Sequence, residues 1–110
     1  MKNYIQVLTT VPSVDEGIGL ARSITSHRLA AGVQIVGPIR SFYWWRGELR
    51  DEQEWQLVIM TTRVLFDALE AHIKANHSYE TPEIIATEIT AGSEDYLAWI
   101  SAETRRIDAS

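Results

Sequence analysis

The sequence predicts an α+β domain with the element order βαββαβ and one further helix at its end. Stretches rich in Val, Ile, Thr and aromatic residues alternate with stretches whose apolar residues recur every three or four positions. Two of the β-rich stretches follow each other with only a turn between them. Because the chain has 110 residues and is 45% hydrophobic, we expect one domain over residues 1–104 and a loose tail over 105–110.

The first strand and first helix are bounded by clear signals. Residues 4–11 are rich in Ile, Val, Leu and Thr, and Pro12 ends this expected strand. Ser13 then begins a capping-box pattern with Glu16, in which each residue is expected to bond the other's backbone N–H. Apolar residues at helical spacing extend the expected helix to His27 or the residue after it.

A long hairpin is the natural interpretation of the middle of the chain. Apolar residues dominate 29–46 and 49–62, and the turn sequence Arg46-Gly47-Glu48 separates them. Gly37-Pro38 interrupts the first arm, which places that arm at a sheet edge or a bulge. An arm of about 14 residues spans roughly 45 Å, whereas a domain of this length is about 35 Å across. The hairpin must therefore bend or project, and its apolar strands predict an obligate homo-oligomer.

The second half of the chain repeats the alternation of helix and strand. An apolar stripe between residues 65 and 73 predicts a helix, and Pro82 then forces an extended or turning connector. Residues 84–89 form the last expected strand, and Ser93 caps a closing helix. This order is the ferredoxin-like split βαβ arrangement followed by a C-terminal helix.

Composition and missing motifs exclude several classes of function. The formal net charge of -5 argues against a nucleic-acid or anionic-membrane partner, and no apolar run approaches a membrane span of about 20 residues. The chain has no cysteine, and it begins without the apolar region of a signal peptide, so we expect a cytoplasmic protein. No phosphate-binding loop, nucleophile elbow or zinc-protease motif is present, so we do not expect an enzyme.

The connector His77–Glu83 is the strongest candidate site. It gathers an imidazole, a phenol and two carboxylates around Pro82, which holds them in a fixed geometry. His77 is the best metal-ligand candidate, with Glu80 and Glu83 as oxygen donors, and such a set suits zinc, copper or nickel. A structural interpretation remains open, in which His77 closes the preceding helix at the negative end of its dipole.

The aromatic residues of the hairpin have two interpretations, and its charged residues have one. Trp44 and Trp45 are neighbours, so in a strand they point to opposite faces. With Tyr43 and Trp55 they form either an aromatic wall for a ligand or packing between subunits. The charged residues near the turn are most simply a solvated tip; they are Glu48, Arg50, Asp51, Glu52 and Glu54.

Four segments, taken in their order and spacing, resemble the CutA family of divalent-cation tolerance proteins. They are Arg28–Val33, Tyr43–Glu48, His77–Glu83 and Asp95–Ile100, and together they extend over nearly the whole chain. The resemblance implies a very stable trimer like the nitrogen-regulatory PII proteins, with hairpins packed between subunits. It also implies a cytoplasmic role in tolerance to copper and other divalent metals, and no reaction.

The resemblance places a cleft between subunits at Trp45, Tyr79 and Glu83. It also implies His77 as a ligand for weakly bound copper or zinc. Departures from the family pattern affect this metal site and a possible anion site. Two cysteines, a second histidine, a proline and two lysines that are proposed or common in the family are replaced here. The six positions are Thr9 or its neighbour, Gly32, Asn76, Ser78, Glu48 and Met60.

Three functions are consistent with these patterns. The first is a CutA-like homotrimer that responds to metal ions and binds weakly at the cleft between subunits. The second is a PII-like trimer that binds a small molecule or a partner protein without metal chemistry. The third is an oligomer with a structural role.

Overall fold

The computed structural model describes residues 3–106 and confirms the expected order of elements. The strands and helices, with one short 3-10 turn, are β1 (Tyr4–Val11), α1 (Val14–Ser26), β2 (Gly32–Trp45), β3 (Glu48–Thr62), η1 (Arg63–Leu65), α2 (Phe66–Ala75), β4 (Ile85–Glu88) and α3 (Glu94–Glu103). Each expected element is present, and its ends differ from the expectation by a few residues at most.

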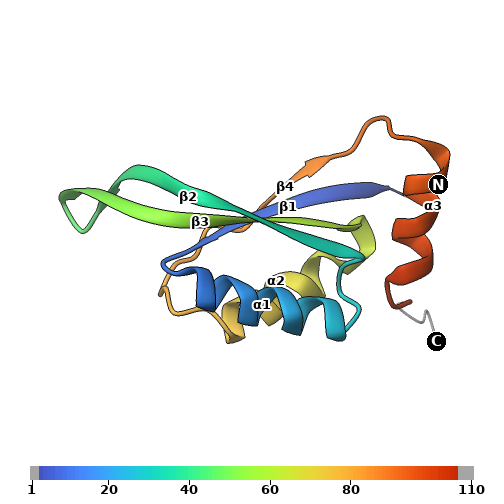
Figure 1. The fold of residues 1–110 in the computed structure, drawn as a ribbon, viewed down its shortest axis with the longest axis horizontal. Helices are drawn as coiled ribbons and strands as arrows, with labels where there is room; N and C mark the ends of the chain where they lie inside the picture. The colour runs from blue at the N-terminus through green and yellow to red at the C-terminus, as the bar shows by residue number, and fades with distance from the viewer. Residues whose placement is uncertain (1–2, 107–110) are drawn as a thin grey trace.

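One four-stranded antiparallel sheet carries the fold, in the strand order β2-β3-β1-β4. This is the ferredoxin-like arrangement predicted from the sequence. Helices α1 and α2 lie side by side across one face of the sheet (Figure 1). The core lies between these two layers, where alternate residues of β1 and β3 meet the apolar stripes of both helices; its members include Ile5, Val7, Leu20, Ile24, Leu57, Ile59, Leu69 and Ile73.

The start of α1 departs from the predicted capping box. Ser13 Oγ accepts a hydrogen bond from the Glu16 N–H at 3.1 Å, as expected of an N-cap. The reciprocal bond is absent among the described residues, because the Glu16 carboxylate turns to the connector and accepts from Ser78. Ser78, a partner distant in the sequence, therefore replaces the expected partner of the Glu16 carboxylate, the Ser13 N–H.

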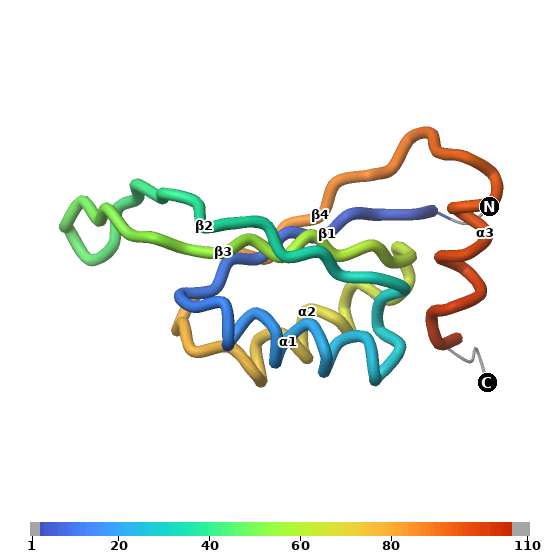
Figure 2. The backbone as a smooth tube through the Cα atoms, in the orientation of Figure 1, coloured from blue at the N-terminus to red at the C-terminus, as the bar shows by residue number. Residues whose placement is uncertain are grey.

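The β2–β3 hairpin extends beyond the helices at one end of the molecule (Figure 2). The longest extent of the molecule is 44 Å, against 29 and 24 Å in the other two directions. Arg46 and Gly47 both have positive φ and form the two-residue turn that matches the twist of the strands. The ladder shifts register between Val36 and Ile39, so Gly37-Pro38 lies at a bulge in an edge strand, as predicted.

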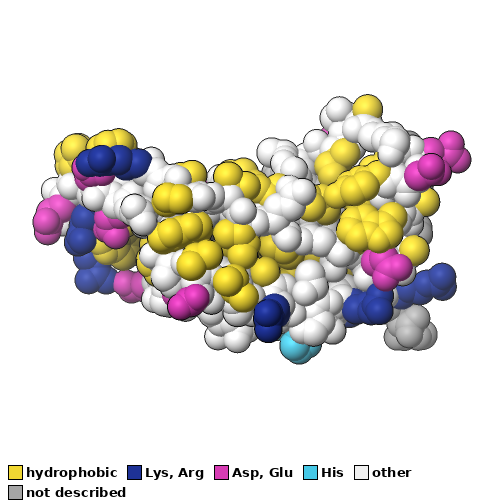
Figure 3. Space-filling model, in the orientation of Figure 1, with side chains coloured by type: hydrophobic (Ala, Val, Ile, Leu, Met, Phe, Trp, Pro, Cys, Tyr) yellow, Lys and Arg dark blue, Asp and Glu magenta, His cyan; other side chains and the backbone are white. Residues whose placement is uncertain are grey.

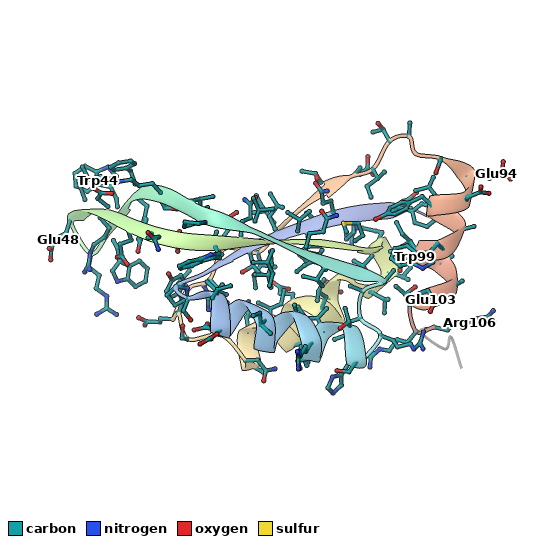
Figure 4. The ribbon with its side chains drawn as sticks, in the orientation of Figure 1. Trp44, Glu48, Glu94, Trp99, Glu103 and Arg106 are labelled. Carbon is teal, nitrogen blue, oxygen red and sulfur yellow. The ribbon has the colours of Figure 1, made fainter. Side chains whose placement is uncertain are left out.

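Helix α3 packs against the opposite end of the sheet from the hairpin tip (Figure 1). Trp99 lies between this helix and the sheet, where it contacts the backbone of Gly32 so closely that a Cβ there would lie 3.1 Å from the indole (Figure 4). A 2.6 Å hydrogen bond joins the Tyr4 and Ser101 hydroxyl groups. In the expected tail over 105–110, the Arg105 N–H donates to the Arg28 carbonyl, and residues 107–110 lie outside the described part.

Candidate ligand cavity

A cavity of about 820 Å³ lies between the hairpin and the His77–Glu83 connector. Trp45, Tyr79 and Glu83, the three residues that the resemblance assigns to a cleft, all line it. Its other lining residues come from the same two segments and the end of β1, and include Thr10, Ser41, Tyr43, Arg46, Arg50, Glu52, Glu54, Glu80 and Pro82. One chain therefore brings these candidate residues together.

The connector is fastened to the domain through His77 and Ser78. The His77 side chain is 0% exposed, and its Nε2 lies 2.7 Å from the Thr10 carbonyl oxygen. Its Nδ1 accepts a hydrogen bond from the Tyr79 N–H at 3.0 Å. Since a carbonyl only accepts, these two contacts assign the imidazole proton to Nε2. The carboxylate of Glu16 accepts from both the N–H and the hydroxyl group of Ser78, at 3.1 and 2.9 Å.

These contacts bear on both interpretations of His77. The imidazole reaches Thr10 near the end of β1, and does not close the end of α2, where Asn76 is the C-cap. Because both ring nitrogens are hydrogen-bonded, a metal at His77 would have to displace one of these partners. Within residues 3–106, no group of three or more His, Cys, Asp or Glu side chains is arranged to hold a metal ion.

The other two histidines lie together at the α1–α2 contact. His72 Nε2 is 2.7 Å from Ser23 Oγ, and the His27 and His72 ring centroids are 4.8 Å apart. Partial burial lowers the pKa of His72, and the nearby His27 and Arg105 add to this effect. His27 Nδ1 lies 2.8 Å from the Ser23 carbonyl in the last turn of α1, as expected of a helix C-terminus.

Glu54 is a buried carboxylate at the floor of the cavity. It was expected in a solvated tip, but that expectation is wrong for this residue, because Glu54 is only 5% exposed. Six residues separate Glu54 from the Arg46-Gly47 turn, and at this distance from the turn the connector lies over β3. The Tyr79 hydroxyl group donates a 2.7 Å hydrogen bond to Glu54 Oε2. Burial, with the bond to Glu54 and its charge, raises the pKa of Tyr79, so the phenol stays protonated as a donor.

Glu83 lies at the rim of the cavity. In the single chain its side chain is exposed, because the connector leaves it at the cavity edge. Partial desolvation raises its pKa, and repulsion from the charge of Glu54 raises it further. The rim and floor of the cavity thus hold two carboxyl groups, and the charge of Glu54 disfavours ionisation of Glu83.

The hairpin presents one face to the cavity. Tyr43 pairs with Arg50 and Trp45 pairs with Glu48 in the β2–β3 register, so these side chains share a face. The Tyr43 hydroxyl group donates to Glu52 Oε1 at 2.9 Å. Trp44 points to the opposite face and is 72% exposed, at the hairpin end labelled in Figure 4. The prediction that the two tryptophans face opposite ways is confirmed.

Arg46 closes the outer end of the cavity. Its guanidinium lies 5.3 Å from the centre of the Trp45 ring, within the range of a cation–π contact. It also forms a 2.6 Å ion pair with Glu80 of the connector. The hairpin turn and the connector are therefore joined at the surface as well as at Glu54.

Sequence reasoning missed Glu54, Glu52 and Arg50 as cavity residues. The signal was present, since on β3 the apolar residues Leu57 and Ile59 occupy the helix-facing positions and residues of even number face the other way. Extending that alternation toward the turn places Arg50, Glu52 and Glu54 on one face. What covers that face is a connector from a distant part of the chain, which the alternation does not reveal.

Comparison with known proteins decides the family. The family model described as CutA1 divalent ion tolerance protein matches residues 5–103. The chain belongs to this family. The Divalent-cation tolerance protein CutA of Thermus thermophilus is 41% identical over 98 residues, which cover 89% of this chain and 95% of that protein. Protein CutA 1, chloroplastic, of Oryza sativa is 48% identical over 101 residues, and the matched part covers 92% of this chain and 57% of the rice protein.

Solved structures of CutA proteins share the fold. The crystal structure of CutA1 from Oryza sativa superposes with a TM-score of 0.93 at 46% identity, covering 96% of both chains. The Thermus thermophilus protein gives a TM-score of 0.88 at 39% identity, covering 96% of this chain and 100% of that one. This chain spans little more than half the length of its two plant relatives. Among the described residues, no helix is long and apolar enough to cross a membrane.

Proposed function

We propose that this CutA chain forms a non-catalytic homotrimer that acts in tolerance to divalent cations and binds its ligand in the hairpin–connector cavity. One observation carries the proposal: Trp45 from β2 and Tyr79 and Glu83 from the connector line a single cavity of about 820 Å³. The names of the family and of its bacterial relatives support the role in cation tolerance.

The exposed apolar surface of the hairpin supports self-association. Trp44 and Leu49 pair across the hairpin, so they share a face, and Phe42 lies on that face two residues away. All three are at least 60% exposed. Hydrophobic side chains are also spread along the face seen in Figure 3. A second copy of the chain that covers this hairpin face would remove apolar area from water; the number three comes from the family resemblance.

His77 remains the proposed ligand for copper or zinc, with weak affinity. No thiolate is available, since the chain has no cysteine, and both imidazole nitrogens already have partners. Binding would require the ring to give up its contact with Thr10 or with the Tyr79 N–H. The affinity is therefore expected to be far below that of a structural zinc site.

A PII-like role in binding a small molecule or a partner protein is the second candidate. The aromatic wall of the cavity and its Glu54 and Glu83 carboxyl groups favour this role, because sites for small molecules combine apolar walls with a few convergent polar groups. In either role we propose a cytoplasmic protein without a nucleic-acid or membrane partner, in keeping with its acidic charge. Two relatives are named for other compartments, the chloroplast and the periplasm.

Light scattering at micromolar concentration tests the assembly. We expect about three times the chain mass of 12.5 kDa. The double variant Phe42→Ser with Trp44→Ser should lower this mass, whereas Val64→Ser should not, although Val64 is also exposed and lies on η1, away from the hairpin. A monomeric or dimeric mass for the wild type across dilution would overturn the trimer.

Calorimetric titration with copper and zinc tests the metal site. We expect weak binding that weakens further as the pH falls, because a metal requires an unprotonated imidazole nitrogen. His77→Ala should abolish it, and the exposed His27 serves as the matched control in His27→Ala. Identical isotherms for wild type and His77→Ala would remove His77 from the site.

A further inference from the structure

The charged side chains that line the cavity do not balance. Four glutamates and two arginines line it. Arg46 pairs with Glu80 at 2.6 Å, and Arg50 lies 3.9 Å from Glu52. Within residues 3–106 this leaves Glu54 and Glu83 without a cationic partner. The cavity therefore holds two carboxyl groups whose charge nothing in the described chain neutralises.

The unpaired state of Glu54 is the more costly of the two. Only 5% of this residue is exposed to solvent. An ionised carboxylate offers about four acceptor sites, yet within the described part of the chain only the Tyr79 hydroxyl group bonds to this one, at Oε2. A buried carboxylate with one hydrogen bond is unfavourable unless a cation accompanies it. Its remaining oxygen is therefore the natural contact for a positively charged ligand.

The wall of the cavity favours an organic cation over a metal ion. Tyr43, Trp45 and Tyr79 line the same cavity as the two carboxyl groups, and the faces of aromatic rings attract ammonium and guanidinium groups. The chain already uses this attraction, since Arg46 packs over Trp45. A metal ion would need more oxygen or nitrogen ligands than two glutamates supply, and no group of three is present in residues 3–106.

From this geometry we propose that the cavity binds a small organic ammonium ion, held between the Glu54 and Glu83 carboxylates and the aromatic wall. The inference rests on the proposed function, whose ligand site it specifies. Arg50 Nε, which is buried and has no hydrogen-bond partner in the described residues, would donate to a polar atom elsewhere on the ligand. The raised pKa of Glu83 agrees with a site that lacks its cation.

Calorimetric titration of the purified wild-type assembly with 1,4-diaminobutane tests the inference. We expect saturable binding that strengthens as the pH rises through the raised pKa of Glu83, because its carboxyl group then ionises. Glu54→Gln and Glu83→Gln should each weaken binding by tenfold or more. Glu94→Gln makes the same change at an exposed position at the start of α3, outside the cavity lining and at the opposite end of the molecule (Figure 4), and should change the affinity less than twofold. The neutral analogue 1,4-butanediol should not bind.

Three results would overturn the inference. The first is no heat of binding from the diamine in a correctly assembled wild type. The second is displacement of the diamine by Mg²⁺ or Zn²⁺ with the same dependence on Glu54, which identifies an inorganic cation site. The third is full binding by Glu83→Gln, a variant at an exposed position that should fold even where Glu54→Gln does not. Light scattering and the copper and zinc titrations report separately on the proposed function, so the two can fail independently.

Discussion

The Tyr79 hydroxyl group donates a 2.7 Å hydrogen bond to Oε2 of Glu54 and so ties the connector to the middle of the hairpin. The two residues are 25 positions apart, and between them lie the rest of β3 and the whole of α2. This bond fixes the depth of the cavity, because it holds the connector over the one carboxylate that β3 buries on that face.

Removing this bond should destabilise the protein without changing its shape. Tyr79→Phe leaves Glu54 buried with no donor, and hydrogen bonds to charged groups contribute about 1.5–3 kcal/mol. We expect a loss of that size in the free energy of unfolding, measured by urea denaturation at fixed protein concentration. Tyr96→Phe is the control, because Tyr96 is exposed. Equal stability of the two variants would show that Glu54 finds another partner.

His77 should matter for stability whether or not it binds a metal. His77→Ala removes a fully buried ring and two hydrogen bonds between the connector and its surroundings. We expect the variant to lose about 2–4 kcal/mol of unfolding free energy. His27→Ala, at an exposed site, should lose less than about 1 kcal/mol. Denaturation in the presence of a chelator separates this structural effect from any metal effect.

Two glycines should respond to alanine with opposite signs. At Gly37 an added Cβ would lie 2.6 Å from Trp55 Cδ1 and 3.2 Å from the Glu54 carbonyl oxygen, so Gly37→Ala should destabilise by about 1–3 kcal/mol. At Gly19 in α1 nothing lies within 4 Å of the added Cβ, and Gly19→Ala should stabilise by about 0.5–1 kcal/mol. Thermal unfolding of the two variants measures both effects, and a stabilising Gly37→Ala would contradict the packing seen at the bulge.

The pH dependence of Glu83→Gln distinguishes a binding role from a structural one. Because folding raises the pKa of Glu83, its carboxyl group contributes stability below its unfolded pKa, and this contribution is lost as the pH rises through the folded value. At pH 7 the ionised group is therefore unfavourable. Glu83→Gln should raise the melting temperature at pH 7 and have little effect at pH 4, as measured by calorimetry. A variant that dissociates, or melts earlier at pH 7, would show instead that Glu83 pairs with a neighbouring subunit.

Local patterns were sufficient for most of the fold. The alternation of apolar residues on β1 and β3, the apolar stripes of α1 and α2 and the caps at Ser13 and Ser93 are interactions between near neighbours, so their sequence signals are direct. The turn at Arg46-Gly47 and the bulge at Gly37-Pro38 follow from the permissive backbone of glycine and the restricted backbone of proline. The family resemblance added the grouping of Trp45, Tyr79 and Glu83.

The sequence by itself determined the order of elements, an edge or bulge at Gly37-Pro38 and the opposite directions of Trp44 and Trp45, because each depends on backbone geometry or on residues close in the chain. Only the tertiary structure decided that Glu54 is buried, that Glu16 binds Ser78 rather than completing its own cap, and that His77 reaches Thr10. Each of these depends on which distant segment covers a given side chain. A carboxylate near a hairpin turn is solvated or buried according to what packs over it, and the residues that pack over Glu54 come from beyond α2.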